Sequence, residues 1–409
     1  MPWKETDIVK ERVKFLLEWE TRWSAGEGFL NFSALCREFG VSRQVGYDWL
    51  GRYREQRDLR AAQSRSCRPL TSPTKVSDEL EDFIVAARKR HPTWGPKKLR
   101  AWIASCNPQV VMPATSTIGD ILSRRGMTQR RLRKPRGTKE ARQPFADVTG
   151  PNATWCVDFK GHFATADGLR CYPLTIIDAH SRYLIRCEGV LDPDGSEVQR
   201  IFDSAFQEFG LPAAIRSDNG PPFASVGAGG LTKLSVWWIR LGIRVERITP
   251  GKPQENGRQE RFHRTLKAET TKPPRADLRA QQRCFDLFRR EYNDVRPHEA
   301  LGQKPPLTMF EKSPRRYPRP LMRVNGDAPW NRQMRIDKQG RMTWDKKLIF
   351  ISTALAHEDV EVRYDDTHWD VVFGALSIGL LCERDGKTEF RPSKGRLADR
   401  REVSGMSSV

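Results

Sequence analysis

Three acidic residues in the middle of the chain stand where the ends of strands and helices could bring them together. Asp158 lies inside a β-type run, between two apolar residues, where an aspartate is costly to bury without a partner or a metal ion. Asp218 ends a second β-type run, and Glu260 lies in the first turns of a helix expected after Pro253. Three hard oxygen ligands without a histidine cluster favour Mg²⁺ or Mn²⁺ over zinc.

Carboxylates that hold such ions support the transfer of a phosphoryl group. Two divalent ions about 4 Å apart activate the attacking oxygen and stabilise the leaving oxygen of an in-line displacement. Water as the nucleophile gives hydrolysis and a DNA 3′-OH gives strand transfer, so no side-chain nucleophile is required. Because three carboxylates repel one another, we expect the site to be loosely arranged when no cation is bound.

Two acidic residues of this region have simpler structural explanations. Asp218 begins the sequence Asp-Asn-Gly, which is also a good turn sequence, and taken by itself it is better explained by a turn. Glu255 lies five residues before Glu260 and therefore about 140° around the helix, so these two glutamates cannot point at one site. A carboxylate in the first turn stabilises a helix N-terminus, and we assign that role to Glu255.

Helical phase separates two faces of the segment "QENGRQERFHRTLK". At about 100° per residue, the apolar Phe262 and Leu266 share one face and are expected to pack on a sheet. The other face is polar and is expected to look along the strand ends. It holds Asn256, Glu260, Arg264 and Lys267. Glu260 is thus the carboxylate that this helix is expected to present to the site.

The chain as a whole is strongly basic. It has 409 residues, a formal net charge of +20 and a pI near 9.9. Such an excess attracts a polyanion, and nucleic acid is the commonest one for a soluble protein. A basic protein without a nucleic-acid role is the alternative. The length predicts roughly two to four domains.

No feature of the sequence points to a membrane or to secretion. No stretch approaches the run of about 18 apolar residues that a membrane span requires. The first residues mix charges into their first turns, unlike a signal peptide. The eight cysteines are scattered and never form a CxxC pair, which is typical of thiols in a reducing compartment. We therefore expect a cytoplasmic protein without a membrane partner.

The segment "NFSALCREFGVSRQVGYDWLGRYRE" predicts a helix-turn-helix. Gly40 permits the positive φ that ends the first helix, and Ser42 can cap the second. The second helix would present Arg43, Gln44 and Tyr47 to the major groove, where Arg and Gln read base edges. An ordinary helical hairpin is the alternative, and the basic linker that follows favours DNA binding.

Two further segments have the composition of DNA-contacting parts. Residues 76–126 hold three short helical segments, each with an N-cap or an N-terminal proline, which predicts a second helix-turn-helix or winged-helix unit. Residues 127–150 form a basic linker without apolar periodicity. We expect this linker to lie along phosphates, although a charge run is usually just a solvated segment. Its candidate DNA contacts are Arg130, Arg131, Arg133, Lys134 and Arg136.

The pattern then changes to β-type runs. Three such runs followed by alternating helices and strands predict an α/β sheet with helices on its faces. Later short runs with Gly-containing turns predict a small antiparallel barrel, so the expected fold is multidomain: all-α helix-turn-helix domains, an α/β core and an all-β barrel. The expected boundaries are 1–57 for the first helix-turn-helix domain, 58–75 for a basic linker, 76–126 for the second helical domain, 127–150 for the second linker, 151–312 for the core, 313–392 for the barrel and 393–409 for a disordered tail.

Five of these runs resemble the integrase core of bacterial insertion-sequence transposases, a family of the retroviral-integrase superfamily. They are "WCVDFKGHF", "LTIIDAHSRYLI", "IRSDNGPPF", "GIRVERITPGKPQENGRQERFHRTLK" and "YNDVRPHEALGQKPP". The resemblance implies an RNase H-like fold and a DDE triad at Asp158, Asp218 and Glu260. It also implies that Arg264 and Lys267 touch element-end DNA. The N-terminal "FSALCREFGVSRQVGYDWLGRYRE" and "TWGPKKLRAWI" are similar to the paired helix-turn-helix units of one branch of this family.

Some features depart from the family pattern. Asp218 and Glu260 are 42 positions apart, which is wider than the usual gap, and the Gly-rich "ASVGAGG" after Phe223 could absorb the excess as a flexible loop. The zinc-binding His/Cys module of retroviral integrases is absent. Asp178, in "IDAHSR", belongs to a family motif, and we interpret it as supporting a turn and not as a ligand.

Together these features predict a bacterial DNA transposase that binds terminal inverted repeats and uses two divalent ions to cleave 3′ ends and join them to target DNA. The expected partners are double-stranded DNA, further copies of the chain in a dimer or tetramer, and an accessory ATPase or target-selection protein. The alternatives are a DNA-binding regulator that retains the core fold and an RNase H-like nuclease without strand transfer. The intact triad argues against the regulator, and the two helix-turn-helix units argue against the nuclease.

Overall fold

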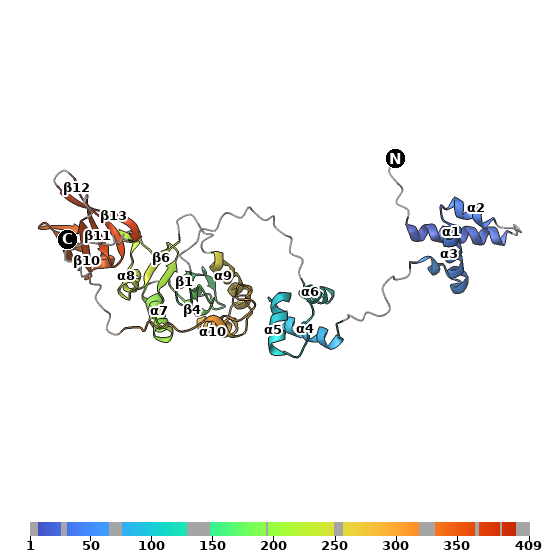
Figure 1. The fold of residues 1–409 in the computed structure, drawn as a ribbon, viewed down its shortest axis with the longest axis horizontal. Helices are drawn as coiled ribbons and strands as arrows, with labels where there is room; N and C mark the ends of the chain where they lie inside the picture. The colour runs from blue at the N-terminus through green and yellow to red at the C-terminus, as the bar shows by residue number, and fades with distance from the viewer. Residues whose placement is uncertain are drawn as a thin grey trace, which may run out of the picture. The chain divides into compact units, whose positions relative to one another are not determined.

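The computed structural model of the chain divides into two compact units, Met1–Lys75 and Val76–Val409, whose elements are labelled in Figure 1. The structure describes residues 7–25, 31–64, 76–128, 148–193, 195–248, 257–318, 332–364, 368–384 and 387–397. Within these ranges, no helix combines the length and the apolar character that crossing a membrane requires. The five basic linker residues expected to contact DNA, together with Asn256 and Glu255, lie outside the described residues.

The first unit is all-helical and contains the expected helix-turn-helix. Its elements are α1 (Ile8–Ser24), α2 (Phe32–Glu38), α3 (Arg43–Gln56) and the 3₁₀ turn η1 (Leu59–Ala62). A side chain in place of Gly46 would meet the Cys36 sulfur at 2.6 Å, so α3 crosses α2 at close range. The Ser42 hydroxyl accepts a hydrogen bond from the Val45 amide and caps α3. The turn between α2 and α3 therefore ends where the sequence places a helix cap.

A second group of helices begins the second unit. It consists of α4 (Asp78–Arg90), α5 (Pro96–Cys106) and α6 (Thr115–Arg124). The Ser77 hydroxyl accepts from the Leu80 amide at the start of α4, and Pro96 occupies the first position of α5. The helices pack around fully buried apolar side chains, among them Ile84, Leu99, Ile103, Ile118 and Ile121. The helices expected between residues 76 and 126 are present.

The centre of the second unit is a mixed six-stranded sheet. Its strands are β1 (Thr154–Phe159), β2 (Phe163–Ala164), β3 (Arg170–Asp178), β4 (Leu184–Val190), β5 (Ala214–Ser217) and β6 (Arg244–Arg247). The main order is β2-β3-β1-β5-β6, and β4 also pairs with β3. The β1–β3 and β3–β4 pairs are antiparallel, whereas β1–β5 and β5–β6 are parallel. This is the expected meander followed by an alternating α/β part.

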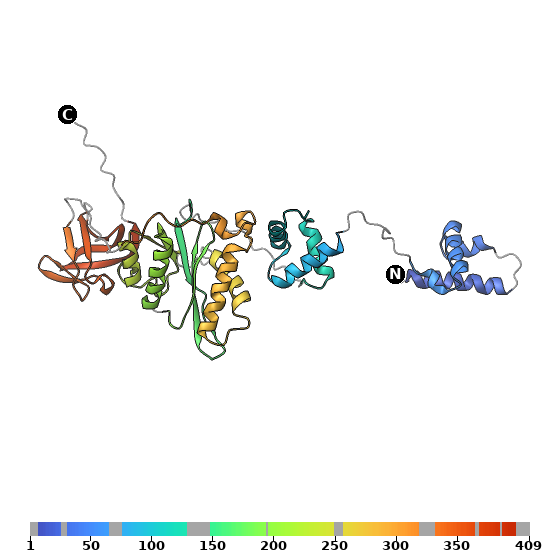
Figure 2. The ribbon, with the colours of Figure 1, turned by 90° about the horizontal axis from the view of Figure 1, so that it is seen from below.

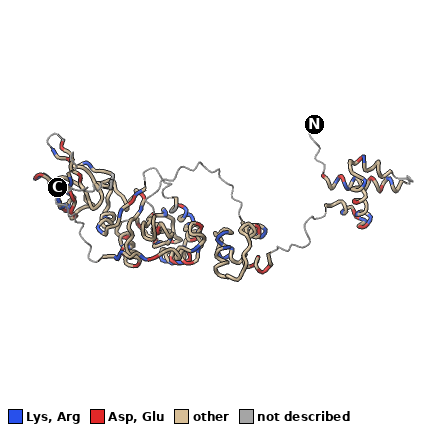
Figure 3. The backbone as a smooth tube through the Cα atoms, viewed as in Figure 1, with Lys and Arg blue, Asp and Glu red and all other residues tan. Residues whose placement is uncertain are grey.

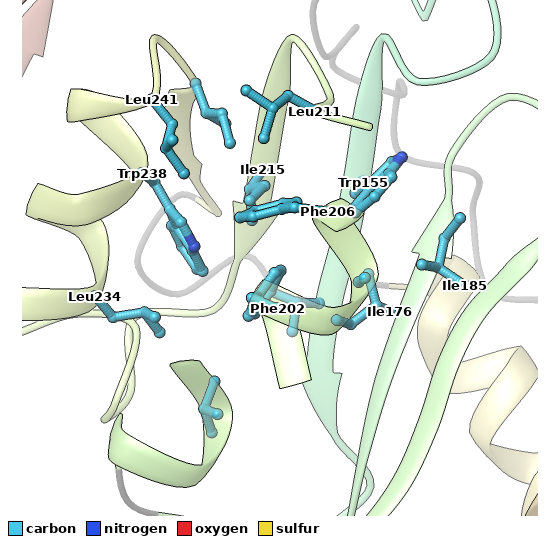
Figure 4. Close-up of a cluster of buried hydrophobic side chains, with 14 of the residues drawn as sticks. Trp155, Ile176, Ile185, Phe202, Phe206, Leu211, Ile215, Leu234, Trp238 and Leu241 are labelled. Carbon is cyan, nitrogen blue, oxygen red and sulfur yellow. The ribbon is translucent and has the colours of Figure 1, made fainter. Parts of the chain in front are cut away.

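Helices cover both faces of this sheet (Figure 2). The helices are α7 (Gly195–Phe209), α8 (Lys233–Arg240), α9 (Gly257–Thr270) and α10 (Leu278–Asp294). Neighbouring residues of β3 point to opposite faces: Ile176 packs with α7 and α8, and Ile177 packs with α9 and α10. In the first cluster, Phe206 of α7 lies between Trp155 and Trp238 (Figure 4). The central sheet is therefore a two-sided core that can hold its strand ends in fixed positions.

The C-terminal part is built from β-strands, as expected, and the strand pairs of the described residues do not show a closed barrel. A five-stranded antiparallel sheet is ordered β13-β12-β11-β10-β7, and β8 and β9 form a separate two-stranded hairpin. The strands are β7 (Arg332–Arg335), β8 (Arg341–Trp344), β9 (Lys347–Phe350), β10 (Asp359–Tyr364), β11 (Trp369–Phe373), β12 (Leu376–Arg384) and β13 (Lys387–Leu397). The expectation of a disordered tail from residue 393 is wrong for residues 393–397, because β13 pairs with β12 as far as Leu397.

Acid should weaken the core through a buried histidine that follows α10. The His298 ring contacts Tyr292 edge to face, and its Nε2 atom is buried without a hydrogen-bond partner in the described structure. Burial, together with the positive charges of Lys98, Arg296 and Arg182, lowers the pKa of His298 to about 3. The unfolded chain binds this proton below about pH 6.5, whereas the folded chain does not.

The free energy of unfolding should therefore fall as the pH drops from about 6.5 toward 3, by up to about 1.4 kcal/mol per pH unit from this group. Scanning calorimetry of the core transition between pH 7.5 and 4.5 measures this slope in wild type and in His298→Gln. The slope should be shallower in the variant, since its residue 298 cannot bind a proton. Parallel pH profiles for the two proteins would show that His298 is not the sensitive group.

Candidate active site and nucleic-acid interface

The register of two parallel strands places two carboxylates side by side. The last residue pair recorded between β1 and β5 is Cys156 with Arg216. Asp158 and Asp218 each lie two residues further along, so they occupy equivalent positions at the carboxyl ends of neighbouring strands. Neighbouring strands lie about 4.8 Å apart, and residues two apart in a strand point to the same face. The structure thus brings these two predicted residues to the same edge of the sheet.

A histidine of α9 lies against the first of these aspartates. The Nδ1 atom of His263 is 3.8 Å from Asp158 Oδ2, and its Nε2 atom is 2.8 Å from the Thr175 hydroxyl. Thr175 in turn donates a hydrogen bond to the Asp158 carbonyl oxygen. Burial, with a smaller effect from Lys160, lowers the pKa of His263 to about 3, so the ring is neutral at neutral pH. The contact is therefore packing between a neutral ring and a carboxylate, and not an ion pair.

Glu260 lies three residues before His263, which is about one helical turn along α9 and about 60° around it. The apolar face of α9 packs as expected, because Phe262 and Leu266 are buried against α10 and the sheet. Glu260 itself is exposed. Within the described residues, no three Asp, Glu, His or Cys side chains are close enough together to hold a metal ion. The strand register places the two aspartates at one edge of the sheet, and the described residues contain no three-residue metal site that includes Glu260.

The surroundings of Asp218 favour a bound cation. Burial raises the pKa of Asp218, and a hydrogen bond from the Gly220 amide to Oδ1, at 3.3 Å, only partly opposes this. A positive charge beside the carboxylate would restore the ionised form that burial disfavours. Two adjacent carboxylates supply the hard oxygen ligands that Mg²⁺ and Mn²⁺ prefer. The donor set at the ends of β1 and β5 therefore fits a divalent cation.

Asp178, at the end of β3, has a different role. Its side chain is completely buried, and it accepts hydrogen bonds from the Asn152 amide at 2.8 Å, the Ser181 amide at 2.7 Å and the Ser181 hydroxyl at 2.6 Å. Both carboxylate oxygens are thus occupied by protein donors. As expected from the sequence, Asp178 supports the turn between β3 and β4, and it also ties that turn to the start of β1.

Replacing Asp178 by alanine should destabilise the core strongly, because the Asn152 and Ser181 amides would lose their acceptor while buried. We expect a loss of about 3 kcal/mol or more, measured as the opening free energy of β1 and β3 by hydrogen exchange. Asp192→Ala removes an exposed aspartate from the next loop and should change the same quantity by less than about 0.5 kcal/mol. Equal effects of the two substitutions would contradict the structural role of Asp178.

The predicted DNA contacts that the structure describes are all exposed. Arg43, Gln44 and Tyr47 are exposed in the first turns of α3, and the Tyr47 ring also packs against Phe32. Arg264 and Lys267 are exposed on α9, one and two turns beyond Glu260. Lys and Arg side chains occur in every described part of the chain, so the net charge of +20 is not confined to one segment (Figure 3).

Two contacting residues were not predicted from the sequence. His263 and Thr175 both touch Asp158, but a single histidine on the core side of a helix and a threonine in a strand carry no recognisable pattern. The only available signal was the spacing of His263, which is three residues after Glu260 and hence on a neighbouring part of the helix surface. The contact of Thr175 follows from strand pairing, because Thr175 lies opposite Asp158 in the β1–β3 register.

Comparison with known proteins agrees with this architecture. Residues 148–253 and 241–306 match integrase core domains, and residues 45–122 match a homeodomain-like domain. The chain is 30% identical over 205 residues to an uncharacterised 31.7 kDa protein of insertion element IS407 from Burkholderia multivorans, covering 50% of this chain and 68% of that protein. It is 28% identical over 236 residues to a 39.2 kDa protein of insertion element IS476 from Xanthomonas euvesicatoria, covering 57% of this chain and 65% of that one.

Among solved structures, the chain is similar to the catalytic core domain of the HTLV-2 integrase in complex with magnesium. The identity is 17% and the TM-score is 0.32, over 40% of this chain and 99% of that domain. The matches span 65% of the IS476 protein and 68% of the IS407 protein. The chain therefore belongs to the insertion-sequence transposases with an integrase core, a family of DDE transposase and integrase enzymes.

Proposed function

We propose that this chain binds the terminal inverted repeats of a mobile element, cleaves the 3′ ends of that element and joins them to target DNA. The observation that carries the proposal is the pair of carboxylates, Asp158 and Asp218, at equivalent positions of two neighbouring parallel strands in an integrase core. The placement of α9 adds support, since His263 of this helix touches Asp158 one turn from Glu260.

Integrase-core enzymes typically use a divalent metal, and the residues proposed to hold two Mg²⁺ or Mn²⁺ ions here are Asp158, Asp218 and Glu260. When bound, such ions activate an attacking hydroxyl group and neutralise charge on the transferred phosphate. The protein supplies a rigid pair of ligands on β1 and β5 and a third ligand on a helix, so Glu260 would complete the site by a movement of α9 or of its own side chain. His263 stays neutral and leaves the Asp158 charge available for a cation.

DNA is proposed to contact the start of α3, the exposed side of α9 and the second basic linker. The start of α3 would enter a major groove, where Arg43 and Gln44 can read base edges and Tyr47 can contact the backbone. Arg264 and Lys267 would contact phosphates next to the reacting strand, because they follow Glu260 on the exposed side of α9. The linker residues 130–136 would add phosphate contacts. Two element ends must meet before they are joined, so the active form is proposed to be a dimer or tetramer on DNA.

Substitution of the carboxylates tests the chemistry. Asp158→Asn, Asp218→Asn and Glu260→Gln should each reduce 3′ nicking of labelled element ends in Mn²⁺ by about 100-fold or more, because each removes a charge that would hold the metal. Glu255→Gln is the matched control, since it makes the same change five residues away and should nick at close to the wild-type rate. Wild-type nicking rates in Glu260→Gln would refute the assignment of this residue.

The same assay separates the competing functions. A wild-type protein that binds element ends but never nicks them with any divalent metal would be a DNA-binding regulator. A protein that nicks DNA but never joins the 3′ end to a second duplex would be a nuclease. The transposase proposal requires both nicked and joined products from the wild-type chain.

Substitution of α3 tests DNA recognition. Arg43→Ala and Gln44→Ala should weaken binding to the terminal repeat by about 10- to 100-fold and bring it closer to the affinity for random DNA, since each removes a base-reading side chain. Lys10→Ala removes one positive charge, as Arg43→Ala does, but from an exposed residue of α1. It should weaken binding to the terminal repeat and to random DNA slightly and equally. Fluorescence anisotropy at one fixed salt concentration measures these affinities. Equal losses for Arg43→Ala and Lys10→Ala would show that α3 does not read bases.

A further inference from the structure

The second half of the segment that widens the gap between Asp218 and Glu260 is packed, whereas its glycines led us to expect a flexible loop. Ala228 and Leu231 are 2% and 1% exposed, and they belong to the same apolar cluster as residues of the C-terminal strands. The 3₁₀ turn η2 (Ala228–Gly230) contacts β12 and β13. A side chain on Gly229 would meet Cγ2 of Ile378 in β12 at 2.8 Å. The insertion is therefore the place where the C-terminal sheet packs on the catalytic core.

Arg247, the last residue of β6, fastens this segment to the central sheet. Its Nη1 atom donates to the Gly229 carbonyl and its Nη2 atom to the Gly230 carbonyl, both at 2.8 Å. Gly230 has a φ of +64°, and a side chain there would collide with this guanidinium group. The two carbonyls are thus presented in a backbone conformation that suits glycine and leaves room for the arginine.

The environment of Arg247 is unusual for a residue that only adds stability. Burial lowers the pKa of Arg247, no described carboxylate pairs with it, and its Nε atom is buried without a hydrogen-bond partner. Arg247 is half-buried, and a charge held partly out of water against two carbonyl groups costs free energy. A role in fixing the geometry of its neighbours explains the charge better.

The neighbours of Arg247 flank a candidate metal ligand. Arg247 is paired with Ser217 in the β5–β6 register, and the amide of the next residue, Ile248, donates to the Ser217 carbonyl at 3.3 Å. The Asn219 side chain donates to the Ile248 carbonyl at 2.8 Å. Both residues adjacent to Asp218 are thus tied to the end of β6. A continuous set of contacts runs from β12 through η2, Arg247 and Ile248 to Ser217 and Asn219, the residues on either side of Asp218.

We infer that Arg247 is a positioning residue through which the C-terminal sheet holds the Asp218 carboxylate in place for metal binding. The inference rests on the proposed metal-dependent function, and it adds that the C-terminal domain is a structural part of the active site. Loosening the contact between η2 and β12 should therefore weaken metal binding at Asp218. Ile378, which makes this contact, lies in the C-terminal sheet and not among the candidate ligands.

Binding of Mn²⁺ to the full chain without DNA tests this inference. Isothermal titration calorimetry should show about tenfold weaker binding by Arg247→Ala and a smaller loss in Arg247→Lys, which keeps the charge and one donor group. Hydrogen exchange should become faster in the segment from β5 to Asn219 and at the end of β6, while β1 and β3 keep their protection. Ile378→Ala should change both quantities in the same direction.

Arg240→Ala is the matched control. Arg240 of α8 also joins the core to the C-terminal domain, through an ion pair with Glu358 at 3.2 Å, but α8 does not flank Asp218. This variant should bind Mn²⁺ like the wild type. The inference is wrong if Arg247→Ala binds Mn²⁺ like the wild type, or if Arg240→Ala weakens binding equally. A lower melting temperature in Arg247→Ala with unchanged Mn²⁺ affinity would also overturn it, since that result shows a purely structural role.

Failure of the proposed function gives a different result, in which wild type and Asp218→Asn bind Mn²⁺ equally. The Arg247 variants cannot produce that outcome. If hydrogen exchange shows that Arg247→Ala loses protection throughout β1 and β3, the Mn²⁺ affinities of Arg247→Lys and Ile378→Ala are compared with that of the wild type instead. Weaker Mn²⁺ binding in both variants supports the inference, and unchanged binding in both refutes it.

Discussion

Parallel pairing of β1 with β5 is the constraint on which the proposed chemistry depends, because it places two negative charges at one edge of a sheet. If both are ionised at a separation close to the strand spacing of about 5 Å, two such charges would repel by about 3 kcal/mol at an effective dielectric constant near 20. The strands cannot move apart to relieve this repulsion, since β1 is also paired with β3 and β5 with β6. Buried clusters on both faces hold the sheet in shape. The repulsion therefore remains available to be offset by a cation.

Much of the surrounding structure serves to hold the ends of these strands. Asp178 ties the turn after β3 to the start of β1, and it uses both carboxylate oxygens for this purpose. On the other side, Asn219 and Arg247 attach the end of β5 to β6 and to η2. The helix that carries Glu260 is placed by its apolar face and by His263, which touches Asp158 without neutralising it. Two of the proposed ligands are thus held by the sheet, and the third proposed ligand is carried by a helix.

Local patterns in the sequence are sufficient to predict many of the helices and strands, and they also led to the choice of carboxylates, which stays a prediction. The apolar positions Phe262 and Leu266 set the phase of α9, and that phase distinguishes Glu260 from Glu255 without any information on distant contacts. The cap at Ser42 locates the start of α3 for a similar reason, since a cap depends on residues within one turn. The exposure of Arg264 and Lys267 follows from the same helical phase.

Features that depend on distant contacts were not accessible from the sequence. The glycines at 227, 229 and 230 are typical of a flexible loop, yet Ile378 and Arg247 hold this segment in place from far away in the chain. The tail was expected to lack structure because of its polar composition, but pairing with β12 extends β13 to Leu397. Short strands with glycine turns also do not specify whether a sheet closes, and the strand pairs of the described residues do not show the expected closed barrel.

The central claim is that Asp158 and Asp218 share a divalent cation. Anomalous diffraction from a crystal of the wild-type protein soaked in Mn²⁺ tests it most directly. The account predicts a manganese peak bonded to carboxylate oxygens of both aspartates, with Glu260 drawn toward the same ion. Manganese bound elsewhere in the crystal while the two aspartates hold none would contradict it.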